Sequence, residues 1–189
     1  ADESSRINLY NAGEVDIMSL NDSNNILKFG ETEGCEVKKV AGAGCYYLGM
    51  NLEKEPFTNP KVREALKYAV NYDEMLNDYW RGTLFPPTGY VQSYCIYAST
   101  AEESGFTYEY NPEKAKQLLA EAGYPDGQGF PTVEYMTNDA KYHKPIAEYL
   151  QSAWKELGIN TDIKIVEWST FTPTRRNGDF EIARNGWVR

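Results

Sequence analysis

The residues best suited to bind a charged ligand lie near the C-terminus. Tryptophan and arginine residues gather there, at positions Trp168, Arg175, Arg176, Arg184, Trp187 and Arg189. The chain has a formal net charge of -9, so this segment reverses the sign of charge locally. Aromatic faces beside guanidinium groups can hold an extended, partly anionic ligand by stacking and charge-assisted hydrogen bonds. A solvated basic edge with core tryptophans fits the same composition, so both interpretations stay open.

The local pattern predicts which elements position these residues. Residues 165–189 have the pattern of a strand, a short helix, a turn and a strand. Upstream, strands alternate with helices of about ten or more residues, which favours an α/β domain with a mixed sheet flanked by helices. The expected strands are 14–19, 35–40, 45–51, 132–137 and 159–166. The expected helices are 3–12, one or two turns within 21–33, 60–70, 73–81, 112–122 and 143–157.

Prolines define three of these helix starts. Asn59-Pro60 and Asn111-Pro112 each pair a capping asparagine with a proline whose missing N–H is harmless in the first turn. Pro145 inside a helix that began at Asp139 would cost about 3 kcal/mol, so we expect that helix to begin near His143. Residues 83–110 show no sustained period, which is typical of a functional loop or a surface embellishment.

Composition excludes several classes of function. With 189 residues and 41% hydrophobic content, the chain can form one sizeable domain or two small ones. No apolar run approaches the roughly 18 residues of a membrane-spanning helix. The sequence pI near 4.7 argues against nucleic acid or an anionic membrane as the main partner.

The cysteines give no sign of a metal site. Cys35, Cys45 and Cys95 form no C-x-x-C pair, and the single histidine leaves too few soft ligands for zinc. We therefore expect no metal and no cofactor. A turn at 42–44 could bring Cys35 and Cys45 into a disulfide, although an extended segment between them would keep them apart, and we expect Cys45 to be buried.

Three segments resemble the extracytoplasmic dipeptide- and oligopeptide-binding proteins of ABC importers. The first begins Tyr46-Tyr-Leu-Gly-Met-Asn51 and continues through Asn59-Pro-Lys-Val-Arg63 to Asp73. The second is Tyr110-Asn-Pro-Glu-Lys114 with the helix that follows it to Tyr124. The third comprises Gly158-Ile159, Glu167-Trp168, Arg175, Gly178-Asp179 and Arg184-Asn-Gly-Trp187. Together they cover nearly the whole chain in the right order.

The resemblance implies a clamshell protein in which two lobes close on an extended oligopeptide. Residues 1–189 would be a single lobe with a periplasmic-binding-protein-like fold, most of the C-terminal one, with the second lobe missing. The family's segment continues past Trp187 to an acidic residue, so we expect this chain to be part of a longer protein. The implied partners are an oligopeptide, the missing lobe and an ABC permease, and the implied location is extracytoplasmic, in the periplasm or lipid-anchored at the cell surface.

The resemblance also implies roles for individual residues. Trp168, Arg175, Arg184 and Trp187 fall on positions that face the ligand, and His143 falls on a position that can approach a peptide's C-terminal carboxylate. Each has an alternative, because Arg175 can be a solvated helix residue, Trp187 a core residue and His143 incidental. We expect Trp80 and Trp154 to pack in the interior, since they lie on apolar stripes.

Two other functions stay open at this stage. Members of the same family take oligosaccharides or nickel complexes, and tryptophans can stack on sugar rings. A carboxylate-based glycoside hydrolase would need Glu134 paired with Asp162 or Glu167. No serine or cysteine nucleophile motif lies near the one histidine and no phosphate-binding glycine loop occurs, so we expect no catalysis.

Overall fold

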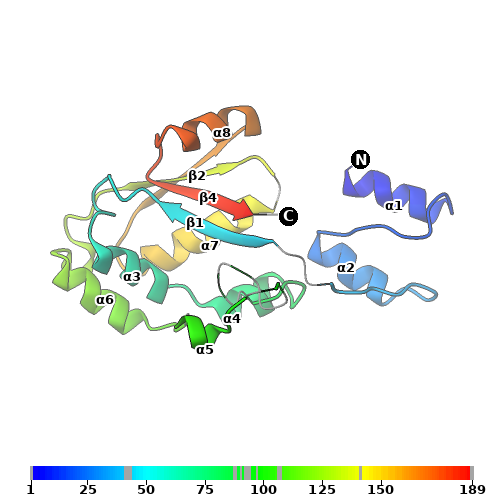
Figure 1. Ribbon diagram of the computed structural model, residues 1–189, viewed down its shortest axis with the longest axis horizontal. Helices are drawn as coiled ribbons and strands as arrows, with labels where there is room; N and C mark the ends of the chain where they lie inside the picture. Colours follow the sequence, from blue (N-terminus) through cyan, green and yellow to red (C-terminus); the bar gives the residue numbers. More distant parts are fainter. Residues whose placement is uncertain are drawn as a thin grey trace. The chain divides into compact units, whose positions relative to one another are not determined.

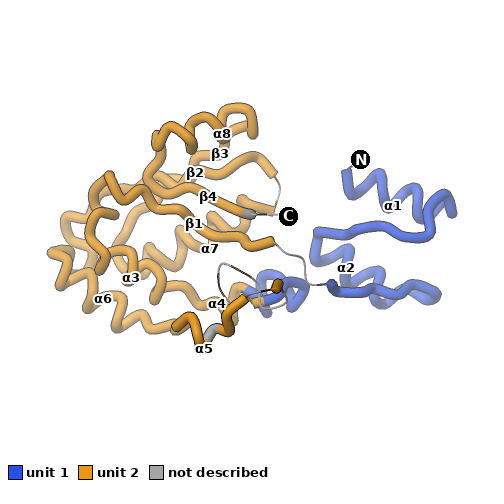
Figure 2. Tube along the Cα trace, in the orientation of Figure 1, with its two compact units in different colours: residues 1–41, 76–85 blue, residues 42–75, 86–189 orange. Residues whose placement is uncertain are grey.

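The structure is a computed structural model of the chain. It describes residues 2–40, 44–86, 89, 91, 95–96, 98–105, 108–140 and 142–187, with only the backbone at 101 and 187. Figure 2 shows two compact units, one formed by residues 1–41 and 76–85 and the other by residues 42–75 and 86–189. The prediction that all 189 residues form one lobe stays a prediction.

The smaller unit consists of two short helices and the segment 76–85. Helix α1 (Glu3–Asn11) is capped by Asp2 and helix α2 (Ser23–Gly30) by Asp22, whose side chains accept backbone N–H groups of the first turn. The hydroxyl of Ser23 lies 2.9 Å from that of Thr83, and Lys39 Nζ donates to the carbonyl oxygen of Gly82 at 2.7 Å. Trp80 is 8% exposed, which confirms its predicted packing role.

Two strands predicted in this unit are wrong. Residues 14–19 and 35–40 alternate in polarity, but neither segment is a strand in the structure. Ile17, in the first of these segments, is 90% exposed. A strand needs a neighbouring strand to accept and donate its backbone hydrogen bonds, and alternation within a segment does not show that such a partner exists.

The larger unit contains a four-stranded mixed sheet, as predicted (Figure 1). Its strands are β1 (Cys45–Met50), β2 (Val133–Asn138), β3 (Thr161–Val166) and β4 (Ile182–Trp187), in the order β1-β4-β2-β3. Strand β1 runs antiparallel to β4, whereas β2 runs parallel to both β3 and β4. The C-terminal segment is therefore strand, helix, turn and strand, as the sequence indicated.

Helices α7 (His143–Lys155) and α8 (Trp168–Arg176) cover opposite faces of this sheet, as Figure 1 shows. Successive residues of β2 confirm the arrangement. Met136 packs against Phe171 of α8, while the hydroxyl of Tyr135 meets that of Tyr46 on the other face. The chain passes from β2 to α7 on one face of the sheet, and from the neighbouring strand β3 to α8 on the other face. In α/β sheets, ligands bind at the carboxyl ends of strands whose connections part in this way. The carboxyl end of β2 is such a position.

The remaining helices begin where their capping residues predict. Asn59 caps α3 (Pro60–Tyr68) and Asn111 caps α6 (Pro112–Glu121), and α7 begins at His143 with Pro145 in its first turn. The apolar stripe of α3 is buried, and Trp154 of α7, 1% exposed, donates from Nε1 to the carbonyl oxygen of Leu66 at 3.1 Å. This confirms the predicted packing of Trp154.

Two segments differ from the expected helices and loops. The predicted helix 73–81 is a single turn, α4 (Tyr72–Glu74), followed by a π-helix over Met75–Tyr79. Within the aperiodic region 83–110, residues Ala101–Ser104 form the short helix α5.

A 3-10 turn at Pro125–Gly127 lies so close to the end of α7 that a Cβ at Gly158 would stand 2.4 Å from the carbonyl oxygen of Asp126.

Candidate functional site

Three strands and the first residue of α7 bring together a polar and aromatic group that we call the edge cluster: Tyr46, Tyr135, His143 and Arg184. The guanidinium carbon of Arg184 lies 5.5 Å from the ring centroid of Tyr46. The rings of Tyr46 and His143 are 5.5 Å apart, and the hydroxyls of Tyr46 and Tyr135 are 3.2 Å apart. The ring of Tyr142 covers His143 at 4.1 Å.

Sheet register explains how these residues meet. Leu48 pairs with Arg184 and Tyr46 with Gly186, so Tyr46 and Arg184 are diagonal neighbours on one face of the β1–β4 pair. Strand β4 pairs with β2 at Ile182 and Ala183, so Arg184 follows directly on the last paired position. His143 comes to the same end of the sheet because only four residues separate the end of β2 from the start of α7.

Several buried polar atoms of this region have no hydrogen-bond partner among the described residues. They are both ring nitrogens of His143 and Nε of Arg184. Tyr142, at the N-cap position of α7, makes no side-chain capping bond. Buried polar groups in folded proteins are almost always paired, and a helix N-terminus favours negative charge. The edge cluster is therefore suited to receive an anionic group that accepts hydrogen bonds.

His143 acts in this cluster as a neutral ring. The side chain is fully buried. Burial, and next the positive charge of Arg184, lower the pKa of His143 to about 4. At neutral pH the imidazole therefore offers one N–H donor and one acceptor nitrogen, and Arg184 supplies the positive charge.

The lowered pKa of His143 predicts a loss of stability in mild acid. The unfolded chain binds a proton near the ordinary pKa of 6.5 and the folded chain only near 4, so the contribution of the neutral ring is complete above pH 6.5 and is lost as the pH falls towards 4. That contribution is roughly 3 kcal/mol. Urea unfolding of the wild type and of His143→Gln at several pH values checks this. The stability difference should change between pH 6.5 and 4, and two parallel pH profiles would contradict it.

A second group lies on the α8 face, which we call the α8 shelf: Trp168, Phe171, Arg175 and Asn185. Trp168 is 55% exposed and stacks on buried Phe171, with centroids 5.7 Å apart and ring planes 25° apart. The guanidinium carbon of Arg175 lies 5.9 Å from the Phe171 centroid. Nη1 of Arg175 donates to Oδ1 of Asn185 on β4. The helical spacing of 168, 171 and 175 puts all three side chains on one face of α8.

The predicted site residues therefore do not form one cluster, contrary to expectation. His143 and Arg184 lie together on the α7 face, whereas Trp168 and Arg175 lie together on the α8 face. Arg184 and Asn185 are successive residues of a strand, so their side chains point to opposite faces. The backbone of Trp187 pairs with Cys45, but its side chain lies outside the described residues. Whether these residues contact a ligand stays a prediction.

Sequence reasoning missed Tyr46, Tyr135 and Asn185. Tyr46 and Tyr135 had a detectable signal, since both lie in predicted strands and the strand of Tyr46 is rich in aromatic residues. The signal for Asn185 was weaker, because only its place directly after Arg184 marked it.

The cysteines and acidic residues form no other site in the described part of the chain. No group of three or more His, Cys, Asp and Glu side chains there is placed to hold a metal ion. Cys35, Cys45 and Cys95 form no disulfide in the described part of the chain, and Cys45 is half-buried instead of buried as predicted. It lies at the start of an edge strand, which explains the exposure. Among the described helices, none combines the length and apolar character needed to cross a membrane.

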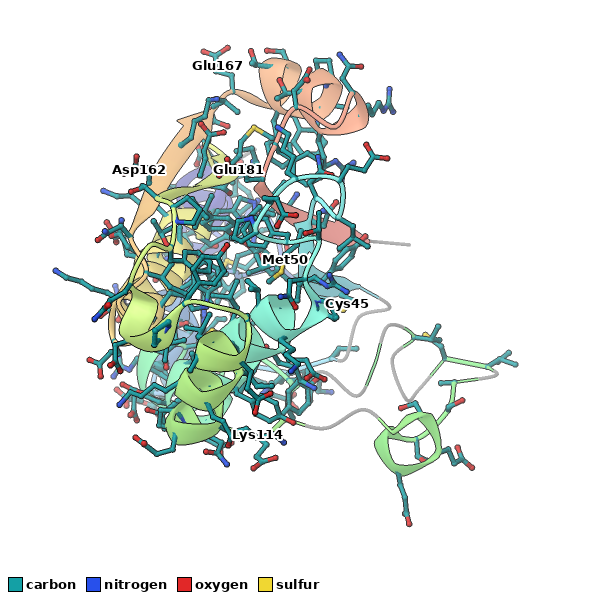
Figure 3. All side chains as sticks on the ribbon, turned by 90° about the vertical axis from the view of Figure 1, so that its left-hand side faces the viewer. Cys45, Met50, Lys114, Asp162, Glu167 and Glu181 are labelled. Atoms are coloured by element: carbon teal, nitrogen blue, oxygen red, sulfur yellow. The ribbon has the colours of Figure 1, made fainter. Side chains whose placement is uncertain are left out.

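The carboxylate pair of a glycoside hydrolase finds little support. Glu134 and Asp162 are opposite each other in the β2–β3 register, but Glu134 forms an ion pair with Lys164 at 3.0 Å. Glu167 follows the far end of β3 (Figure 3). Glu167 is five residues along the chain from Asp162, a distance of about 16 Å in a strand. Glu134 lies opposite Asp162, so it is also farther from Glu167 than the roughly 10 Å limit for paired catalytic carboxyl groups. The pairing of Glu134 with Glu167 is therefore wrong.

Comparison with known proteins gives the same family along the whole chain. The family model described as bacterial extracellular solute-binding proteins, family 5 Middle, matches residues 1–189. The chain is 32% identical to the periplasmic oligopeptide-binding protein OppA of Escherichia coli, over 99% of this chain and 35% of the relative. It is 30% identical to heme-binding protein A of Haemophilus influenzae, over 98% of this chain and 34% of the relative.

Solved structures agree. The oligopeptide-binding protein OppAIV of Borrelia burgdorferi is 28% identical with a TM-score of 0.79, over 98% of this chain and 36% of that one. DppA of Helicobacter pylori, in complex with the peptide STSA, is 28% identical with a TM-score of 0.76, over 100% of this chain and 35% of that one. This chain thus spans about a third of the length of the proteins it matches. By the match along its full length, the chain belongs to family 5 of the bacterial extracellular solute-binding proteins.

Proposed function

We propose that this chain is one lobe of a longer extracytoplasmic solute-binding protein that captures extended oligopeptides for import by an ABC permease, without catalysis. The observation that carries the proposal is the edge cluster at the start of α7, where Nε of Arg184 and the ring nitrogens of neutral His143 are buried without a hydrogen-bond partner among the described residues. Relatives whose names or titles specify peptides, and the short span of this chain within them, support a two-lobed protein.

In this proposal the edge cluster binds the terminal carboxylate of the peptide. The guanidinium of Arg184 and one ring N–H of His143 donate to the carboxylate oxygens, and the N-terminal end of the α7 dipole adds partial positive charge. Tyr46 and Tyr135 form a wall beside them; burial raises the pKa of Tyr46 to about 12, so its hydroxyl stays neutral. The second lobe would close over the peptide and exclude water.

One observation favours other cargo within the family. Trp168 exposes 55% of its surface on the α8 shelf and is already stacked on Phe171, as a wall for a flat ring or a sugar would be. A relative 30% identical is named a heme-binding protein. Oligosaccharides, heme and nickel complexes are therefore the alternative ligands to test.

Calorimetric titration of the full-length protein that contains this chain tests the proposal. We expect di- to pentapeptides with a free C-terminal carboxylate to bind, and the same peptides as C-terminal carboxamides to bind at least about tenfold more weakly, because a carboxamide lacks the charge that Arg184 and α7 favour. Cello-oligosaccharides, heme and a nickel chelate serve as the comparison ligands. Heat from one of these and none from any peptide would contradict the proposal.

A further inference from the structure

We infer that Asn185 is a positioning residue that holds Arg175 as a second cationic binding group, selective for a carboxylate in a ligand side chain. The inference rests on the proposed function. It concerns the α8 shelf, which lies on the opposite face of β4 from Arg184. Nη1 of Arg175 donates to Oδ1 of Asn185, and Asn185 is 9% exposed, so the amide is a fixed, buried acceptor.

The acceptor is an amide and not a carboxylate, so Arg175 keeps its net positive charge. An Asp at position 185 would neutralise Arg175 through an ion pair, whereas the Asn orients the guanidinium and leaves its positive charge intact. Within the described residues, no carboxylate lies within ion-pair distance of Arg175. A guanidinium has five N–H donors in a planar fork, so donors remain for a ligand after one is given to Asn185.

Neighbouring residues keep Asn185 in place. Its Nδ2 lies 3.5 Å from the carbonyl oxygen of Ala183, which orients the amide with Oδ1 towards Arg175. On the adjacent strand, a Cβ at Gly49 would stand 2.6 Å from Nδ2 of Asn185, so a larger residue there would force the Asn185 side chain out of this position. The Phe171 ring lies against the guanidinium of Arg175. Arg175 is thus held from two sides, by β4 and by its own helix.

The arrangement provides one cationic group on each face of β4. Arg184 lies on the α7 face of β4, and Arg175 lies on the α8 face, where Asn185, the residue after Arg184, holds it. A peptide that crosses this end of the sheet with its terminal carboxylate at Arg184 can present a second carboxylate to Arg175. Peptides that contain glutamate or aspartate at the matching position should therefore be favoured over their neutral amide counterparts.

A tripeptide scan on the full-length protein tests this inference. Glutamate and glutamine are placed in turn at each position of an alanine tripeptide, and each pair is titrated by calorimetry. In the wild type we expect glutamate to bind about tenfold more tightly than glutamine at one position, as one additional charge-assisted hydrogen bond would give. In Asn185→Asp the ratio at that position should fall to about one.

Two further variants separate positioning from charge and from folding. Gly49→Ala leaves the charge unchanged but displaces Asn185, so it should also lower the ratio while alanine tripeptide still binds. Asn160→Asp adds the same charge at an exposed position before β3 and should leave the ratio as in the wild type. Equal binding of glutamate and glutamine peptides by the wild type, or an unchanged ratio in Asn185→Asp, would overturn the inference. Failure of every peptide to bind would instead overturn the proposed function on which it rests.

Discussion

Replacement of Arg184 by methionine in the full-length protein should weaken peptide binding by about 100-fold, equivalent to about 2.7 kcal/mol. The guanidinium is the only positive charge in the edge cluster, since burial keeps His143 neutral. Methionine preserves much of the side-chain length and can still pack on Tyr46. Calorimetry with a free-carboxylate tripeptide measures the loss.

The matched control is Arg176→Met, which makes the same chemical change at an exposed position on α8. This variant should bind the tripeptide within about twofold of the wild type, because an exposed charge contributes little. The Arg184 variant should also raise the pKa of His143, since the positive charge of Arg184 helps to lower it. Equal affinities of the two variants would show that Arg184 does not hold the ligand.

Replacement of Trp154 by alanine should lower the free energy of unfolding by about 3 to 5 kcal/mol. The indole is 1% exposed and connects α7 to α3 through its Nε1 bond to the carbonyl oxygen of Leu66. The variant opens a cavity and leaves a buried carbonyl oxygen without its donor. Urea unfolding of the 189-residue chain measures the change.

Trp168→Ala is the control for this substitution, because it removes the same side chain from an exposed position. Its free energy of unfolding should fall by about 1 kcal/mol or less. A loss below about 1 kcal/mol for Trp154→Ala would contradict the assignment of that residue to the core. A loss of equal size in both variants would mean that the α8 shelf is as tightly packed as the interior.

Elements with a strong local signal were predictable from sequence. Asn59-Pro60 and Asn111-Pro112 contain both the cap and the first-turn proline, so the chemistry that starts each helix is local. Pro145 fixed the start of α7 for a similar reason, since a proline is tolerated only in the first turn. The strand, helix, turn and strand of the C-terminal segment followed from periodicity in the same way.

The errors arose where structure depends on distant partners. Residues 14–19 and 35–40 alternate like strands, but only another strand can complete their hydrogen bonds, and alternation does not reveal one. The π-helix at Met75–Tyr79 likewise cannot be distinguished from an α-helix by the spacing of apolar residues in the sequence. Local pattern therefore gave the sheet of the larger unit more reliably than the extended segments of the smaller one.

The candidate site was predicted as a set of residues but not as an arrangement. Arg184 was identified, but its partners Tyr46 and Tyr135 come from strands far away in the sequence and meet it only through register. Arg175 was identified, but its hydrogen-bond partner Asn185 was not, because the Asn185 side chain occupies space that the missing Cβ of Gly49 leaves open. Which face of the sheet each helix covers decides the grouping, and that is a property of the fold.

A crystal structure of the full-length protein with a bound tripeptide tests the central claim most directly. The account predicts that the terminal carboxylate lies within hydrogen-bond distance of the Arg184 guanidinium and of one His143 ring nitrogen, at the start of α7. A peptide carboxylate bound elsewhere, with Arg184 and His143 making no contact with the ligand, would contradict it.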